Sequence, residues 1–246
     1  MNSEKFARLA KRLASNPDRS DHGQLLPRLG AALEGSSGAK QVSAVVEAIR
    51  VERVIVPVPV EKHPDEAGEH RPQDLGPDAA VPLEVDGQGS DRAIVIFSSA
   101  DQLREWDPQA RPLAMDSQRV ALTAASVGVP RLRLDPAGVN LLVPRPAVES
   151  LAAGDSWLPG WEDSALAQSL LEDARAHGSW ASFVDVRVLP GPDGSLSVEV
   201  SAAPKSADPD AVRTSFAALL GVLGKNSKLA AATETVHFVP RLLSQT

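Results

Sequence analysis

The five histidines of this chain are its obvious candidates for acid–base chemistry, and the chain contains no cysteine. The absence of cysteine excludes disulfides, thiolate metal sites, iron–sulfur clusters and cysteine nucleophiles. His22, His63 and His70 lie in polar segments, where solvated side chains are expected. His177 ends a predicted helix and His237 lies within a predicted strand, so both are predicted to be structural.

His63 and His70 lie close to three acidic residues, Asp65, Glu66 and Glu69, a set that a metal ion could use. The segment is rich in proline and glycine, and it offers no thiolate ligand, so no preformed coordination geometry is implied. We therefore predict no metal site.

The adjacent serines Ser98 and Ser99 follow a predicted buried strand, which is where some hydrolases place their nucleophile. The glycine-flanked turn that exposes such a serine is absent, and the sequence identifies no histidine as its base, so a helix cap explains the pair better. The glycines do not form a phosphate-binding loop of either common spacing. We therefore predict no catalytic residue and no cofactor site.

The composition of the chain limits the class of protein to which these residues belong. The chain has 246 residues, of which 43% are hydrophobic but only 4% are aromatic, so Val, Leu, Ile and Ala must fill the core. Its net charge of −7 opposes binding to duplex nucleic acid and to anionic lipid. No apolar run approaches the length of a membrane span, and no apolar signal segment opens the chain, so we expect a cytoplasmic protein.

The first third of the chain predicts helices followed by a strand that contains proline. Residues 3–14 form a basic amphipathic pattern typical of a docked or frayed terminus, although a helix that binds a membrane surface or a partner is the alternative. Pro57 and Pro59 confine the strand Arg53–Val60 to a sheet edge or a strand end. Helices are predicted over Leu25–Leu33 and Ala39–Arg50, and an exposed loop over Glu61–Pro82.

The middle of the chain predicts short strands and helices in quick succession. Asp135-Pro136-Ala137-Gly138 predicts a β-hairpin, because proline presets one turn residue and glycine permits a positive φ. The remaining elements expected here are a strand over Arg92–Phe97, a helix ending at Trp106 and a helix after Asp116.

The last third predicts the order α-β-β-α-β, with a helix over Asp163–His177, a hairpin around Gly191–Gly194 and a final strand over Thr235–Val239. Such an order suits helices that cover one face of a sheet. We therefore predict an α+β fold with two small domains, each a mixed or antiparallel sheet covered by helices.

The block Ala93–Asp163, with its apolar runs, its Asp-Pro turns and its order of elements, resembles the N-terminal domain of the SseB (enhanced serine sensitivity) family in its actinobacterial form. The last third is similar to the second domain of the longer family members. The resemblance implies an N-terminal helix and linker over 1–23, an SseB N-terminal-like domain over 24–154, a Trp-containing linker over 155–163 and an SseB C-terminal-like domain over 164–246.

Two of the four tryptophans, Trp157 and Trp161, lie in the predicted linker. Tryptophans at such a joint either pack the domains together or anchor a partner, and we favour domain packing. If the protein binds a partner, the candidate surface consists of residues near the linker and on the proline-containing strand: Trp157, Trp161, Trp106, Arg53, Val56 and Val58.

The resemblance implies a non-enzymatic interaction or regulatory protein with no cofactor and an unidentified protein partner. A small-molecule sensor for an amino-acid-related ligand, or an unrecognised hydrolase, is the first alternative; a pocket lined by Asp101, Asp135 or Asp185 with a shifted pKa would favour it. Another alternative, suggested by the family alone, is an accessory factor of translation. Edge strands could also pair two copies into a homodimer.

Overall fold

The computed structural model describes residues 21–58, 85–88 and 92–243, and it shows an α+β fold. The chain divides into two compact units. Unit 1 comprises residues 1–143 and 148–156, and unit 2 comprises residues 144–147 and 157–246. Two predicted segments lie outside the described residues: the helix over 3–14 and the loop over 61–82, which contains His63 and His70.

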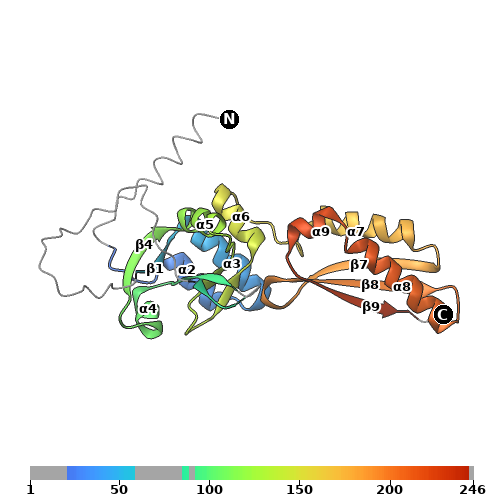
Figure 1. Ribbon diagram of the computed structural model, residues 1–246, viewed down its shortest axis with the longest axis horizontal. Helices are drawn as coiled ribbons and strands as arrows, with labels where there is room; N and C mark the ends of the chain where they lie inside the picture. The colour runs from blue at the N-terminus through green and yellow to red at the C-terminus, as the bar shows by residue number, and fades with distance from the viewer. Residues whose placement is uncertain (1–20, 59–84, 89–91, 244–246) are drawn as a thin grey trace, which may run out of the picture. The chain divides into compact units, whose positions relative to one another are not determined.

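Unit 1 contains a mixed sheet of order β2-β3-β5-β6, in which β3 and β5 run parallel and the other neighbours antiparallel. Figure 1 labels the helices of this unit. A second, two-stranded antiparallel sheet joins β1 to β4. The elements are α2 (Pro27–Gly35), α3 (Gly38–Val51), β1 (Arg53–Val58), β2 (Val85–Asp86), β3 (Ala93–Ile96), α4 (Ala100–Trp106), β4 (Arg111–Asp116), α5 (Ser117–Ser126), β5 (Leu132–Leu134), β6 (Leu141–Val143) and α6 (Arg145–Ala153).

Helix α3 illustrates why the sequence pattern produces these elements. Val42, Val45, Val46 and Ile49 recur at helical spacing and form one apolar stripe. All four side chains are buried. The helix therefore forms mainly because it buries this stripe against the rest of unit 1.

Strand β1 accommodates its proline without losing a bond to β4. The backbone N–H and carbonyl of Ile55 both form hydrogen bonds with Phe97, which follows β3. Every second residue of β1 therefore directs its backbone groups toward Phe97 and away from β4. Pro57 shares this direction, and its missing N–H therefore removes no bond of the β1–β4 ladder. The last two residues of the predicted strand Arg53–Val60 lie outside the described residues.

The predicted hairpin is confirmed: β5 pairs antiparallel with β6 across the turn that begins at Asp135. The residues with a positive φ differ from the prediction. They are Asp135, at 48°, and Asn140, at 49°, whereas Gly138 does not have a positive φ. A Cβ at Gly138 would come close to the side-chain oxygen of Gln102, which is the far end of a flexible side chain and can move aside, so glycine is not required there.

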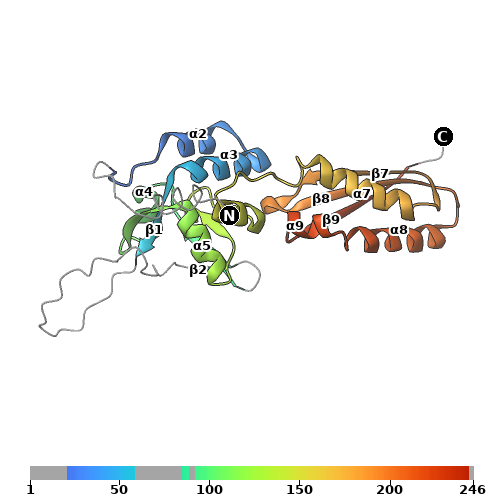
Figure 2. The same ribbon diagram turned by 90° about the horizontal axis from the view of Figure 1, so that it is seen from above.

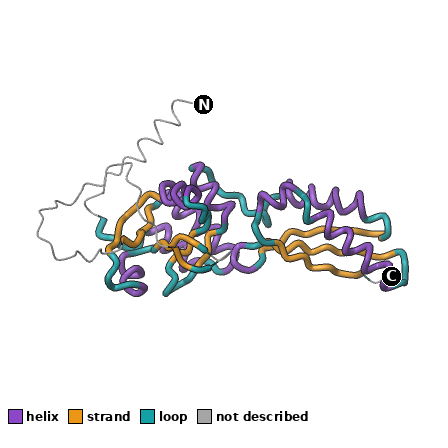
Figure 3. The backbone as a smooth tube through the Cα atoms, in the orientation of Figure 1, coloured by secondary structure: helices purple, strands orange, loops and turns teal. Residues whose placement is uncertain are grey.

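Unit 2 is a three-stranded sheet of order β7-β8-β9, with β8 antiparallel to β7 and parallel to β9. Helices cover one face of this sheet, as Figures 2 and 3 show. The elements are α7 (Ser164–His177), β7 (Ala181–Pro190), a 3₁₀ turn (Pro192–Gly194), β8 (Leu196–Pro204), α8 (Pro209–Leu223), α9 (Ser227–Ala232) and β9 (Val236–Leu242). The predicted order omitted α9, which occupies part of the connection between α8 and β9.

The two faces of the unit 2 sheet differ in composition. On one face, Val198, Val200 and Phe216 belong to a buried core to which α7, α8 and α9 all contribute. The opposite face carries Arg187 and Arg241, whose side chains are more than half exposed, on either side of the buried Glu199. Unit 2 thus follows the predicted arrangement of a sheet with helices on one face.

Strand β9 is an edge strand with one proline on its free side. The N–H of Leu243 donates to the carbonyl of Ala202 at 2.8 Å, while Leu242 is the residue aligned with Ala202. Backbone groups alternate in direction along a strand, so the odd-numbered residues of β9 bond to β8. Leu242 and Pro240 therefore direct their backbone groups to the free edge, where proline removes no ladder bond.

Within the described residues, no helix is both long and apolar enough to cross a membrane. The same residues contain no group of three or more histidine, aspartate or glutamate side chains arranged to hold a metal ion.

Candidate functional site

The polar residues that the sequence singled out in unit 1 lie where β3 and β5 end. Because these two strands are parallel, their carboxyl ends meet at one edge of the sheet. Ser98 and Ser99 follow β3, and Asp135 follows β5. This edge is where open sheets with parallel strands commonly bind ligands, so it is the first candidate site.

Ser98 and Asp135 contact each other directly at this edge. The backbone N–H of Ser98 donates to a carboxylate oxygen of Asp135 at 2.8 Å, and both residues are buried. Burial raises the pKa of Asp135, an effect that the hydrogen bonds from Ser98 oppose. The Ser99 hydroxyl accepts from the N–H of Gln102 at 3.2 Å and caps α4, as the sequence predicts.

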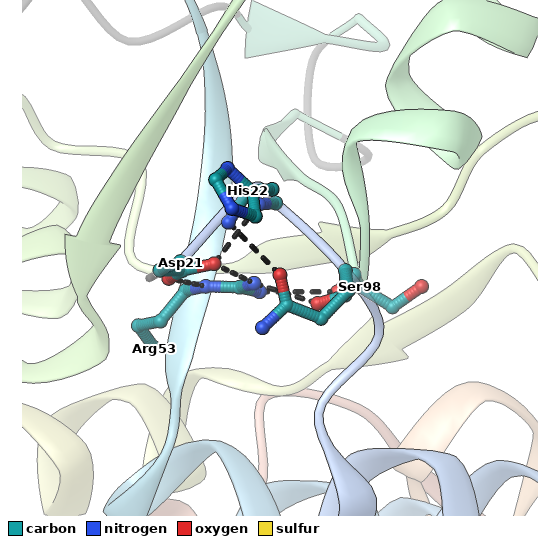
Figure 4. Close-up of polar contacts among 6 residues, drawn as sticks. Asp21, His22, Arg53 and Ser98 are labelled. Atoms are coloured by element: carbon teal, nitrogen blue, oxygen red, sulfur yellow. Dashed lines mark hydrogen bonds and ion pairs between the residues drawn. The ribbon is translucent and has the colours of Figure 1, made fainter. Parts of the chain in front are cut away.

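Arg53 joins a distant segment to this edge, as Figure 4 shows. Its guanidinium donates two hydrogen bonds, of 2.6 and 2.7 Å, to the Asp21 carboxylate. It also donates to the carbonyls of Gln24, at 2.6 Å, and Ser98, at 3.3 Å. The hydrogen bond from Arg53 lowers the pKa of Asp21 below its ordinary value. We call Asp21, Gln24, Arg53, Ser98 and Asp135 the polar clamp.

The clamp holds residues 21–24 over the beginning of α4. The carbonyl of Gly23 accepts the N–H of Ala100, the first residue of α4, at 2.7 Å. Gly23 has a φ of +81°, and a Cβ built there would lie 2.7 Å from the Cβ of Ala100. Only glycine fits this approach, so the chain itself occupies the end of α4 that faces this edge.

The clamp has the contacts of a structural joint. The backbone N–H of His22 donates to the side-chain carbonyl of Gln24 at 2.9 Å, and no described hydrogen bond links Ser98 or Ser99 to a histidine ring. Asp21 is ion-paired with Arg53, with both side chains less than one-fifth exposed. At this edge, the Asp21 and Asp135 carboxylates and the Ser99 hydroxyl each accept hydrogen bonds from the protein itself.

The other two carboxylates that the sensor alternative required do not join Asp135. Asp101 is exposed and forms an ion pair with Arg104 on the surface of α4. Asp185 lies on β7 in unit 2 and is partly buried. None of the three lines the pocket formed beside α8.

Of the four predicted surface residues of unit 1, Val56 is buried and the other three are partly buried. Trp106 packs against Phe97, with ring centroids 5.4 Å apart, and both rings belong to one apolar cluster. Val56 has no exposed area, and Val58 is partly buried. Val56 therefore offers no surface to a partner in this structure, and Arg53 serves the clamp.

Trp157 and Trp161 lie together in unit 2. Their rings meet edge to face with centroids 5.5 Å apart, and Trp161 packs against the buried core of the unit. Leu158, between them in sequence, is 60% exposed. The pair thus has a packed member, Trp161, beside an exposed leucine.

A groove beside α8 is the site that sequence reasoning missed. It has a volume of about 690 Å³, and we call it the α8 groove. Four apolar side chains of α8 and two prolines, one from β8 and one from β9, form most of its wall: Pro209, Val212, Phe216, Leu220, Pro204 and Pro240. The spacing of Val212, Phe216 and Leu220 at i, i+4 and i+8 was the available signal, but such a stripe alone also fits a core-facing helix.

The pKa of Asp135 leads to a testable pH dependence of the stability of unit 1. The folded state binds the proton of Asp135 more tightly than the unfolded chain, so wild-type stability decreases as pH rises from 3.8 through the raised folded pKa. Asparagine at this position stays neutral, tolerates the positive φ and can still accept from Ser98. We expect Asp135→Asn to be stabilising at neutral pH, with an advantage that vanishes in acid.

Urea unfolding from about pH 3 to about pH 8 would measure this difference. Asp101→Asn is the control, because that carboxylate is exposed on the surface of α4. A stability difference between Asp135→Asn and wild type that stays constant with pH would contradict the expectation.

Comparison with known proteins identifies a family for the first unit. The family model described as the SseB protein N-terminal domain matches residues 28–150, half of the chain. No curated protein and no solved structure matches the chain. The matched region contains α2 to β6, most of α6, and all of the polar clamp except Asp21 and Gln24. On this match, the chain belongs to the SseB family.

Proposed function

We propose that this SseB-family protein is a non-enzymatic interaction protein that binds an apolar segment of another protein in the α8 groove. The observation that carries the proposal is the composition of the groove wall, in which only Ser206 and Arg213 have polar side chains. A wall of this kind recognises large apolar side chains through burial of their surface.

A free amino acid or another small polar ligand would bind poorly to such a wall. Its charged groups would lose water without gaining a converging set of partners. Arg213, the one cation of the wall, already bonds Asp210 at 3.0 Å. The amino-acid sensor is therefore the less supported alternative.

The position of the groove favours a protein segment as its occupant. The groove borders the C-terminal end of β9, where Leu242 directs its backbone N–H and carbonyl to the free edge and no partner is described for them. An extended segment can thus meet both an apolar wall and a short stretch of strand backbone. The internally satisfied polar clamp supports a non-catalytic role for unit 1.

Two adjacent alanines of α8 provide a matched test. Ala217 and Ala218 are both exposed, but only Ala217 lines the groove. A glutamate at Ala217 places a charge against the apolar wall, and the same change at Ala218 does not. We expect peptides selected from a displayed random library on the full chain to carry several large apolar residues, and to bind Ala217→Glu at least about tenfold more weakly.

Binding of the same peptides to Ala218→Glu should match that of wild type, and thermal unfolding of both variants checks that they fold. The proposal fails if no peptide is selected, or if the selected peptides bind Ala217→Glu as well as wild type. A thermal-shift series with the free amino acids tests the sensor alternative, and a stabilising amino acid would favour it.

The finer parts of the proposal rest on the resemblance. We place residues 164–246 as the second SseB domain of the actinobacterial form, and the protein in the cytoplasm. The association with translation is tested by sedimentation of the full chain with ribosomes. A protein that stays entirely in the supernatant would remove this alternative.

A further inference from the structure

The outer edge of β7 carries three unpaired backbone N–H groups in a row. The N–H of Gly191 donates to the carbonyl of Ser195 at 2.9 Å in the hairpin, which shows that odd-numbered residues of β7 bond to β8. By alternation, Val184, Val186 and Val188 direct their N–H and carbonyl groups away from the sheet. No described hydrogen bond satisfies these groups.

The two edges of the unit 2 sheet differ in whether a further strand can pair with them. On β9, Pro240 lies among the outward-directed residues and interrupts the row of donors. On β7, all three central outward positions are valines, and they lie between the irregularity at Ala181–Phe183 and the proline at the end of the strand, Pro190. A stretch of edge with three successive free donors is a template for strand pairing.

We infer that two copies of this chain pair antiparallel through β7, with the two-fold axis at Val186. The sheets of the two units 2 then join into one continuous sheet. Val186 faces Val186 of the second copy, Asp185 faces Arg187 of the second copy, and Phe183 faces its Leu189. The inference is independent of the α8 groove, because no residue of β7 lines that groove.

Charge selects this register over its neighbours. In an antiparallel pair, residues that direct their backbone N–H and carbonyl groups outward must lie opposite residues that do the same. The two-fold axis can therefore pass only through a residue position, and the neighbouring registers have their axes at residues 185 and 187. An axis at residue 185 places Asp185 opposite Asp185 of the second copy, and an axis at 187 places Arg187 opposite Arg187. Like charges directly opposite each other destabilise a strand pair. With the axis at Val186, Asp185 of each copy lies opposite Arg187 of the other, which gives two pairs of opposite charge.

The side chains of this register are available for the contact. Phe183 is 51% exposed, an unusual state for a phenylalanine on a strand, and the Arg187 side chain is 63% exposed. Glu199 already has Arg241 at 2.8 Å and lies 4.0 Å from Arg187, so Arg187 can turn to Asp185 of a second copy without leaving Glu199 unpaired. Pairing would cover Phe183 with Leu189 of the second copy.

Charge reversal tests both the contact and its register. We expect the full chain to form dimers in sedimentation experiments between about 1 and about 100 µM. Asp185→Arg creates two Arg–Arg pairs, and Arg187→Asp creates two Asp–Asp pairs, so each should weaken the dimer at least about tenfold. The double variant that exchanges the two residues restores opposite charges and should dimerise like wild type. A mixture of the two single variants should form a mixed dimer.

The charge-matched control is Arg104→Asp, which makes the same change at an exposed position of α4 in unit 1 and should leave the dimer unaffected. Amide exchange provides a second readout, because Val184, Val186 and Val188 should become protected as concentration rises. Restoration by the exchanged double variant and in the mixture separates lost pairing from lost folding. A full chain that stays monomeric, or single reversals that dimerise as wild type does, would overturn the inference.

Discussion

Replacing Arg53 with methionine should lower the unfolding free energy of unit 1 by about 3 kcal/mol. Methionine keeps much of the packing volume but removes every donor that holds Asp21, Gln24 and Ser98. The Asp21 carboxylate would remain mostly covered and without its cation, which is the costly half of breaking a buried pair. We also expect residues 21–24 to detach from α4.

Arg50→Met is the matched control, three residues earlier in the chain. Arg50 pairs with Glu47 on the surface of α3, at i and i+3, and the Glu47 side chain is 52% exposed. Such a pair contributes little, so this variant should lose less than about 0.5 kcal/mol. Hydrogen exchange of the β3 amides measures the stability of unit 1 without interference from unit 2. Equal losses in the two variants would show that the clamp contributes no more than a surface ion pair.

Arg53→Met should also change the response of unit 1 to acid. The pKa of Asp21 is lowered in the folded protein, chiefly by the hydrogen bond from Arg53, so its contribution is present above the ordinary value of 3.8. That contribution is lost as pH falls through the folded pKa. Wild type should therefore lose more stability on acidification than Arg53→Met, and the two stabilities should converge in acid.

Trp161→Ala should destabilise unit 2 by about 3 kcal/mol, because the ring packs against the buried core of the unit. Trp157→Ala removes a partly buried ring whose described ring contact is the edge of Trp161, and should cost only about 1 kcal/mol. Exchange rates of the β8 amides in the two variants would measure the difference. If Trp157→Ala proves the more damaging, then the assignment of Trp161 as the packed member is wrong.

This difference matters for any search for a partner. If a double alanine variant of Trp157 and Trp161 failed to bind a partner, the loss could come from unfolding of unit 2 or from removal of a contact with the partner. Trp157→Ala, or a change at the exposed Leu158, tests the surface more cleanly. Removal of Trp161 informs on the stability of unit 2.

Local pattern was sufficient to predict most elements of the fold. The apolar stripe of α3, the hairpin at Asp135 and the N-cap of α8 at Asp208 are all determined within a few residues of sequence. Helix α9 escaped prediction because Ser227–Ala232 is only six residues long and half alanine, which gives no amphipathic period. Its cap, Asn226, was the remaining local signal.

The candidate sites depended on contacts that no local pattern contains. The clamp joins Asp21 to Arg53 across 32 positions, and Ser98 to Asp135 across 37. Ser98 and Asp135 could have been placed together from two adjacent parallel strands, but the strand order was not predictable from the sequence alone. The α8 groove likewise needs Pro204 and Pro240 beside one helix, which only the register of β8 and β9 brings about.

The proline on the free side of β9 also determines how far association can proceed. A sheet with two equivalent open edges can gain copies indefinitely and grow into a fibre, whereas a sheet with one pairing edge cannot. Once two copies have joined through β7, both outer boundaries of the combined sheet are β9, each interrupted at Pro240. Growth should therefore end at a closed pair, and this one residue gives the protein a defined stoichiometry and protection against fibril formation.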